Sequence, residues 1–218
     1  MVATKPLRRS QSQRREGTRK LLLDAAIDSL VERGYANTTT TDVSDRAGVS
    51  RGGQLHHFRT KAELMSAAIE HVFQRRHEEY LAAIAHLPAG ADRAAASIDQ
   101  LWRILSGPTF YAWLELVVAA RTEPQLRKSI SDIAGRFAAT VDVSYRNQFP
   151  EAVSSPFFEM VPGFTFALLQ GLALENILEE GSLPKNRIPR VLETFRQLSQ
   201  IILPQVHLPI RKAKKGRA

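Results

Sequence analysis

The 218-residue chain contains no cysteine, which excludes disulfides, thiolate zinc sites and cysteine nucleophiles. Long apolar runs are also missing: the longest, around residues 164–174, contains Gln170 and is far shorter than the roughly 20 residues that span a bilayer. The first basic residues are not followed by the apolar core of a secretory signal. We therefore expect a soluble, cytoplasmic protein with no membrane partner.

Motifs typical of enzymes are missing as well. No glycine-rich phosphate loop and no paired acid/base motif stands out. We therefore expect no catalytic residue and no cofactor. His56 and His57 are adjacent, but neighbouring side chains on a helix point about 100° apart and cannot easily chelate one ion, so no metal site is expected either.

The net charge of +8 is unevenly distributed along the chain. Residues 1–20 carry +6 and residues 211–218 carry +5, and subtracting these eleven charges from the total leaves the rest of the chain at −3. Basic ends on a slightly acidic body attract polyanions such as nucleic acid or an anionic membrane surface. The alternative is that both ends are disordered, solubilising tails.

The spacing of apolar residues predicts helices throughout, and no convincing alternating strand pattern appears. The first helix is expected at residues 17–33, with Gly34 in the position of a helix-ending glycine. Two short helices follow, the second capped by Ser50, and a capping box of Thr60 and Glu63 opens a long helix. Further helices are expected at about 91–105, 110–121, 124–149, 156–180 and 187–203.

Residues 40–58 have the layout of a helix-turn-helix, in which a glycine turn joins two short helices. Ala47 allows the two helices to approach closely, and Gly48 can adopt the left-handed turn conformation. The second helix can then lie in the major groove of DNA. Gly52 and Gly53 leave room for the first turn of that helix to approach a phosphate. The alternative is a poorly formed loop with no partner.

Over residues 18–64 the sequence resembles the TetR family of dimeric bacterial transcriptional regulators. Beside the apolar first helix, the resemblance rests on Glu32-Arg33-Gly34-Tyr35, Thr38-Thr39-Thr40, Ala47-Gly48-Val49-Ser50, His57-Phe58, Thr60-Lys61 and Glu63-Leu64. It is specific for about the first quarter of the chain, and the rest matches only in length and in being all-helical.

The resemblance implies an all-α fold. An N-terminal three-helix DNA-binding domain with a helix-turn-helix would be joined by a long helix to a C-terminal helical bundle for ligand binding and dimerisation. We expect a basic N-terminal arm at 1–16, the DNA-binding domain at 17–64, the ligand-binding and dimerisation domain at 65–205, and a basic tail at 206–218.

The resemblance also implies which residues contact DNA. They are Thr40, Thr41, Arg51, Gly52, Gly53, Gln54, Leu55, His56, His57 and Lys61. Lys61 would reach a phosphate. Arg51 is expected to read a base, since arginine to guanine is the commonest specific contact, and a phosphate clamp is the alternative. Three arginines in the arm or just after it would add phosphate or minor-groove contacts: Arg14, Arg15 and Arg19.

The sequence departs from the family at Gln54 and Leu55, where an apolar residue and an aromatic one, often tyrosine, are usual. The phosphate contact expected from an aromatic hydroxyl is therefore missing. Leu55 lies three residues before Phe58 and is expected to join the small core. Gln54 would then be free to read adenine through a bidentate pair.

The last two thirds of the chain contain most of the aromatic residues. As a set they can line an apolar cavity, the usual form of a small-molecule site, or they can simply form the core of the bundle. The nominal lining residues are Trp102, Trp113, Phe137 and Phe164, and Arg121 and Glu123 are charged candidates for orienting a ligand. The family resemblance adds an inducer within the bundle, here an apolar or aromatic small molecule.

Residues 157–178 are apolar nearly all round, so a helix there must be covered on both faces. Residues 187–203 add a second broad apolar face. In a bundle of this size one face meets the core and the other needs a partner. We therefore expect a homodimer formed through these two segments, as the resemblance also implies. Two-fold symmetry pairs two recognition helices with two half-sites and predicts a palindromic operator.

Together these observations predict a homodimeric transcriptional repressor that binds a palindromic operator in double-stranded DNA. A small-molecule inducer would release it by tilting the long helix that starts at Lys61. The alternatives are a DNA-binding regulator without an inducer, either constitutive or controlled by a partner, and an activator.

Overall fold

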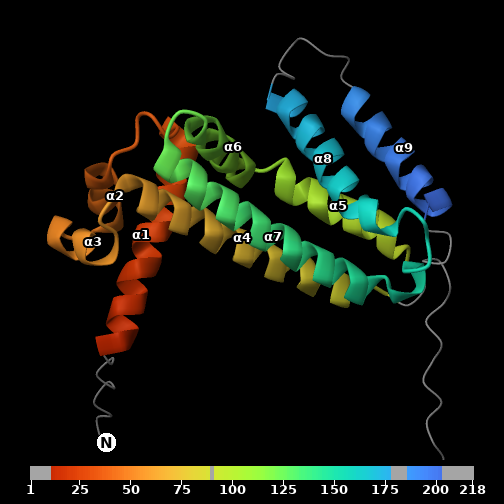
Figure 1. Ribbon diagram of the computed structural model, residues 1–218, viewed down its shortest axis with the longest axis horizontal. Coiled ribbons are helices and arrows are strands. Elements are labelled where there is room, and N and C mark those ends of the chain that lie inside the picture. The colour runs from red at the N-terminus through yellow and green to blue at the C-terminus, as the bar shows by residue number, and fades with distance from the viewer. Residues whose placement is uncertain (1–10, 89–90, 178–185, 203–218) are drawn as a thin grey trace, which may run out of the picture. The chain divides into compact units, whose positions relative to one another are not determined.

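The computed structural model describes residues 11–88, 91–177 and 186–202 (Figure 1). Their helices are α1 (Gln11–Arg33), α2 (Thr40–Ala47), α3 (Arg51–His57), α4 (Lys61–Ala85), α5 (Arg93–Leu105), α6 (Pro108–Ala120), α7 (Pro124–Gln148), α8 (Val161–Ile177) and α9 (Arg187–Ile202). Two 3-10 turns, Pro150–Ala152 and Phe158–Met160, precede α8. The predicted all-α class is confirmed. Within these ranges no helix is long and apolar enough to cross a membrane.

The first helix begins six residues earlier than predicted. Residues 11–16, expected in the basic arm, form the first turns of α1. Their glutamine, arginine and glutamate side chains favour a helix, and a single glycine at position 17 does not end it. Arg14 and Arg15 therefore project from a helix. Residues 1–10 of the predicted arm and the whole predicted tail at 206–218 lie outside the described residues.

The described chain forms two compact units, and the first comprises residues 11–73 and 111–134. Its core joins α1, α2, α4, α6 and the first part of α7, with Phe58 contributing from just after α3. The largest buried side chains are Leu22, Leu23, Leu30, Val43, Phe58, Leu64, Met65, Ile69, Leu116 and Leu126. The unit therefore extends beyond the predicted boundary after residue 64. The difference arises because Leu116 and Leu126, from helices expected in the C-terminal domain, fill the same core as Leu22.

Glycines end the first two helices, as the sequence predicts. Gly34 follows α1 with φ of 71° and Gly48 follows α2 with φ of 64°, both in the left-handed region. The two sites differ in their surroundings. A Cβ atom on Gly48 would meet nothing within 4 Å, whereas one on Gly34 would lie 2.7 Å from the Glu115 carboxylate. That carboxylate accepts a hydrogen bond of 2.8 Å from the Tyr35 backbone N–H.

This contrast predicts different costs for the same substitution. Gly48→Ala should lower the free energy of unfolding by about 1–2 kcal/mol, through backbone strain alone. Gly34→Ala should cost about 1 kcal/mol more, because Glu115 must move and release the Tyr35 N–H. Urea unfolding of both variants measures the difference. An equal loss of unfolding free energy in the two variants would show that Glu115 does not stabilise the turn after α1.

The second unit comprises residues 74–110 and the described residues from 135 onward. One apolar cluster joins α5, α8 and α9 through Ile98, Leu169, Leu172, Ile188, Leu192 and Phe195. On the surface of this unit, Arg196 of α9 pairs with Asp99 of α5 at 2.6 Å. A second cluster, around Phe149 and Phe158, lies beside the end of α7.

His77 of α4 is half-buried in the second unit, and its Nε2 atom lies 2.8 Å from the hydroxyl of Ser144 on α7. Burial lowers the pKa of His77 below its usual value, and burial likewise lowers that of His57 in the first unit. The unfolded chain therefore binds protons first as the pH falls, and stability present above about pH 6.5 is lost below it.

We expect the free energy of unfolding to fall between pH 6.5 and pH 5, by at most about 1.4 kcal/mol per pH unit for each such histidine. His77→Gln, which can still hydrogen-bond Ser144, should make this dependence shallower. Adding His57→Gln should flatten it further. Thermal unfolding over this pH range measures both effects, and unchanged slopes in both variants would contradict the expected role of burial.

Candidate nucleic-acid interface

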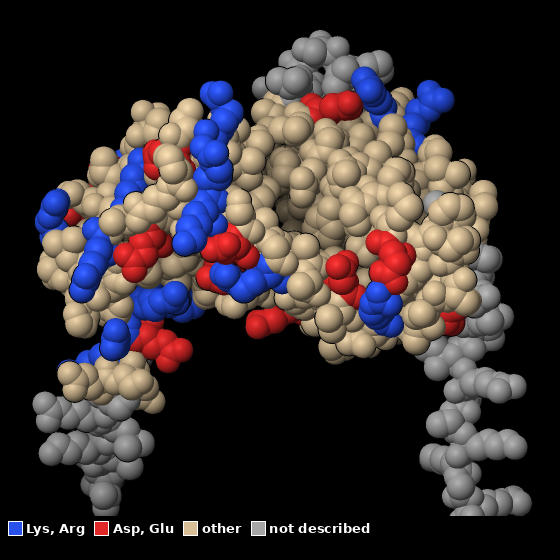
Figure 2. Space-filling view, in the orientation of Figure 1, with Lys and Arg blue, Asp and Glu red and all other residues tan. Residues whose placement is uncertain are grey.

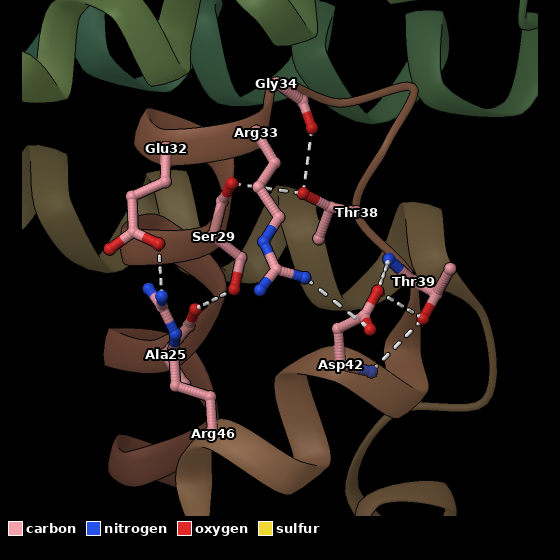
Figure 3. A network of polar contacts seen from close by, with 9 residues as sticks. All are labelled: Ala25, Ser29, Glu32, Arg33, Gly34, Thr38, Thr39, Asp42 and Arg46. Atoms are coloured by element: carbon pink, nitrogen blue, oxygen red, sulfur yellow. Dashed lines mark hydrogen bonds and ion pairs between the residues drawn. The ribbon is translucent and has the colours of Figure 1, made fainter.

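The helix-turn-helix is held by polar contacts between α1 and α2 (Figure 3). The buried Thr38 hydroxyl is within hydrogen-bond distance of the Ser29 carbonyl of α1, at 3.1 Å, and of the Gly34 carbonyl just after α1, at 2.8 Å. Two ion pairs at the surface also link the helices: Arg46 with Glu32, and Arg33 with Asp42 at 3.6 Å. These contacts position α2 against the core of the first unit.

Thr39, one of four consecutive threonines at positions 38–41, is the residue that caps α2. Its hydroxyl accepts the Asp42 backbone N–H at 3.1 Å, and its own backbone N–H is accepted by the Asp42 carboxylate at 3.0 Å. The Thr39 hydroxyl, followed by its N–H, holds the pKa of Asp42 below its usual value. With Thr39 as the cap, Thr40 and Thr41 form the first turn of α2.

The second helix of the motif is α3, and its exposed side is the candidate DNA-reading surface. Ser50 caps it as predicted, accepting the Gly53 N–H at 3.2 Å. Arg51, Gly52, Leu55 and His56 are exposed. The Arg51 guanidinium donates a 2.8 Å hydrogen bond to the Thr41 hydroxyl, so one contact links the first turns of α2 and α3. This contact orients the arginine before any partner binds.

The two glycines of α3 differ in what surrounds them. A Cβ atom on Gly52 would meet nothing within 4 Å, so its position is open to a partner. A Cβ atom on Gly53 would lie 3.1 Å from Val49 and 3.3 Å from the Ser50 hydroxyl. The missing side chain at Gly53 therefore fits the turn and the cap within the protein, in addition to the approach to DNA predicted for both glycines.

The predicted placement of Gln54 and Leu55 is wrong. Gln54 is 1% exposed, and its Nε2 atom donates a 2.5 Å hydrogen bond to the backbone carbonyl of Phe58. Leu55, expected in the core, is 46% exposed. The carbonyl just after the end of α3 requires a donor, and Gln54 supplies it from one turn earlier. The Gln54 amide is therefore buried and already hydrogen-bonded, so it is not available for the adenine contact that was predicted for it.

Lys61 also lies differently from the prediction. Its ammonium donates a 2.5 Å hydrogen bond to the Tyr35 backbone carbonyl and lies 4.0 Å from the centre of the Tyr35 ring. Burial lowers the pKa of Lys61. The Tyr35 hydroxyl in turn donates to Glu123 at 2.8 Å, which makes Glu123 part of the first unit's own framework rather than a free group for a ligand. Lys61 stabilises the turn after α1 instead of reaching outward to a phosphate.

The surroundings of α3 are positively charged. The pKa of His57 is lowered first by burial and then by the electrostatic effect of His56, Arg15 and Arg19. Arg19 also lies 5.6 Å from the centre of the Phe58 ring, at the end of α3. On the face drawn in Figure 2, Lys and Arg side chains are numerous over the first unit. This charge suits a phosphate backbone.

The side chains of His56 and His57 contact each other. The rings of His56 and His57 are 5.7 Å apart between centres and meet edge to face. Among the described residues, no three His, Asp or Glu side chains are grouped so that they could hold an ion.

The four nominal ligand-lining residues are divided between the two units. Trp113 packs on Phe73 at 5.1 Å in the first unit. In the second unit, Trp102 packs against the α5, α8 and α9 cluster. Phe137 meets Phe166 at 5.9 Å, and Phe164 is 55% exposed. The spacing of aromatic residues along the chain did not indicate which of them share a cluster.

Comparisons with known proteins agree with this site. The family model for "Bacterial regulatory proteins, tetR family" matches residues 22–68. An uncharacterised HTH-type transcriptional regulator from Mycobacterium tuberculosis is 33% identical over 83% of this chain and 94% of its own. The HTH-type transcriptional regulator CymR from Pseudomonas putida is 31% identical over 89% of this chain and 95% of its own.

A solved structure shows the same fold. It is a transcriptional regulator from Saccharomonospora viridis in complex with choline, with a TM-score of 0.65 and 17% identity over 84% of this chain and 96% of that one. The helix-turn-helix and these relatives define a DNA-binding transcriptional regulator, and not an enzyme. The chain belongs to the tetR family of bacterial regulatory proteins.

Proposed function

We propose that the chain is a homodimeric repressor, released from a palindromic operator by a small molecule. The orientation of α3 is the observation that supports sequence-specific DNA binding. Its exposed side presents Arg51, already oriented by its bond to Thr41, while Gln54 and Phe58 are buried on the opposite side. The proposed contacts come from α2 and α3: Thr40, Thr41, Arg51, Gly52, Gly53, Leu55, His56 and His57. Residues 17–64 supply these contacts, and residues 65–205 supply ligand binding and dimerisation.

Exposed apolar side chains support the homodimer. The 3-10 turn before α8 exposes Met160, and α8 and α9 expose Phe164, Leu174, Ile177, Leu198 and Ile201. In Figure 2 the body of these two helices carries mostly uncharged side chains. A monomer rarely leaves so many large apolar groups in water unless a partner covers them. The proposed interface is 157–178 and 187–203, of which residues 178 and 203 lie outside the described residues.

The path of the chain supports a response to a ligand. Helices α4, α6 and α7 each begin in one unit and end in the other, so three continuous helices connect the second unit to the first. A ligand that binds better to one arrangement of the second unit than to another shifts the arrangement of the first, by its difference in affinity. The choline complex of the Saccharomonospora regulator supports a small organic ligand in this fold.

The test is a titration of the preferred DNA duplex with and without ligand. Compounds that raise the melting temperature of the protein are first identified by thermal unfolding. An inducer among them should weaken binding to the duplex by about 5- to 150-fold, the usual range of coupling between two sites. If every stabilising compound leaves DNA affinity unchanged, the chain is a regulator without a small-molecule inducer.

A further inference from the structure

Uncharged polar side chains meet inside the second unit, where α4, α5 and α7 contribute Tyr80, Ser97, Tyr145 and Gln148. The Tyr80 hydroxyl donates a 3.0 Å hydrogen bond to the Gln148 side-chain carbonyl. Burial raises the pKa of both tyrosines, and Ser97 beside Tyr80 offsets part of the rise for that residue. Both phenols are therefore neutral hydroxyl donors at physiological pH.

Three polar atoms of this group have no hydrogen-bond partner, although each is sealed from solvent: the Ser97 hydroxyl, the Tyr145 hydroxyl and the Gln148 Nε2. The Gln148 side-chain carbonyl accepts the hydrogen bond from the Tyr80 hydroxyl, and the amide nitrogen is the unpaired end. Buried polar groups are nearly always paired, so unpaired ones that lie together require a reason.

All three unpaired atoms can donate a hydrogen bond. A hydroxyl can donate or accept, but the amide nitrogen of glutamine only donates, so a group that meets all three must bring acceptor lone pairs. Aromatic rings border the same place: the Tyr145 ring lies 4.6 Å from Phe158 and 5.1 Å from Phe149, between centres. The surroundings therefore suit an acceptor oxygen carried on an apolar or aromatic body.

A charged acceptor is not favoured here. Arg93 lies beside this group and donates a 2.7 Å hydrogen bond to the backbone carbonyl of Gln148. The same guanidinium is paired with the Glu151 carboxylate, so its charge is already balanced. A buried carboxylate would lose its hydration without gaining a free cation, whereas a ketone, ester or amide oxygen would gain donors at little cost.

We propose that Tyr145, Gln148 and Ser97 form the binding site for an uncharged small molecule that combines a hydrogen-bond-accepting carbonyl oxygen with an apolar or aromatic body. The regulatory role of this site rests on the proposed ligand response, whereas the binding itself does not. Tyr145 and Gln148 are half-buried as residues, so the ligand reaches their covered polar ends by displacing neighbouring side chains.

The first test uses two tyrosine variants of the full chain. Tyr145→Phe removes an unpaired hydroxyl and should raise the melting temperature by about 2–4 °C. Tyr80→Phe removes a paired hydroxyl and should lower it. A lower melting temperature for Tyr145→Phe would show that its hydroxyl is already satisfied in the free protein and would overturn the proposal.

The second test compares three probes with the same ring: acetophenone, benzoate and ethylbenzene. Calorimetry should show acetophenone binding the wild-type protein about fivefold or more tightly than the other two, and a loss of about fivefold or more in Tyr145→Phe. Tighter binding of benzoate, equal binding of ethylbenzene, no loss in Tyr145→Phe, or no binding of any probe at millimolar concentration would overturn the site.

The effect on DNA separates this inference from the proposed function. If acetophenone binds as expected but leaves affinity for the preferred duplex unchanged, the site stands and the proposed ligand response fails for it. If another compound releases the duplex equally well from wild type and Tyr145→Phe, the ligand response stands and the assignment of this site is wrong.

Discussion

Replacement of Arg51 by alanine should weaken binding to the preferred duplex by about 1–3 kcal/mol for each half-site, which is about 5- to 150-fold per half-site. The side chain is exposed on α3, and its bond to the Thr41 hydroxyl fixes the guanidinium in advance. If it reads guanine through two hydrogen bonds, preference at one base position of each half-site should also disappear. Fluorescence anisotropy with duplexes changed at single positions measures both effects.

Two matched variants complete this experiment. Arg51→Lys keeps the positive charge but cannot form the same bidentate pair, so it should also lose the base preference. Arg75→Ala removes an exposed arginine of α4 that is paired with Glu79, and should leave binding nearly unchanged. If Arg51→Ala weakens binding to every sequence equally and keeps the preference, Arg51 is a phosphate clamp and does not read a base.

The double variant Leu198→Glu/Ile201→Glu should be a monomer and should bind the preferred duplex at least about 100-fold more weakly. Both side chains are exposed on α9, at 44% and 74%, one turn apart on the same side of the helix. Charges there would have to be buried in the proposed interface without partners. A monomer also loses the advantage of binding two half-sites at once, which is worth about 10² or more.

Sedimentation at micromolar concentration measures the oligomeric state, and circular dichroism checks that the fold is kept. Val143→Glu is the matched control, because Val143 is 59% exposed in the same unit but belongs to α7. It should leave both the oligomeric state and DNA affinity unchanged. A double variant that stays dimeric would place the dimer interface elsewhere.

Local chemistry predicted the helix-turn-helix well, because its signals act within a few residues. Gly34 and Gly48 adopt the left-handed conformation expected of helix-ending glycines, and Ser50 caps α3. The run of four threonines at 38–41 does not by itself show which one caps α2, since each offers the same hydroxyl. Asp42, three residues after Thr39, decides the choice by completing a reciprocal capping box.

The orientation of α3 could not be predicted from spacing. Leu55 and Gln54 both lie within one turn of the buried Phe58, and hydrophobicity alone favours the leucine for the core. The structure buries Gln54 instead, because its amide satisfies the Phe58 carbonyl. A buried glutamine with a backbone partner is as acceptable as a leucine, and only the path of the chain after α3 reveals that partner.

Contacts between distant parts of the sequence were also beyond prediction. The Tyr35 backbone carbonyl accepts a hydrogen bond from Lys61 of α4, and the Tyr35 hydroxyl donates one to Glu123, 88 positions away. The motif contained Tyr35 and Lys61 but gave no sign that they meet. Tyr145 and Gln148 could have been noticed as polar residues three apart on one face of α7, yet their unpaired atoms become evident only beside Tyr80.

The measurement that tests the central claim most directly is selection of preferred sequences from random duplex DNA by the full chain. We predict an enriched inverted repeat, with its two half-sites about one helical turn or a multiple apart and with guanine at a fixed position in each half. Binding that enriches no sequence, or only an isolated half-site, would contradict a dimer that reads a palindromic operator through α3.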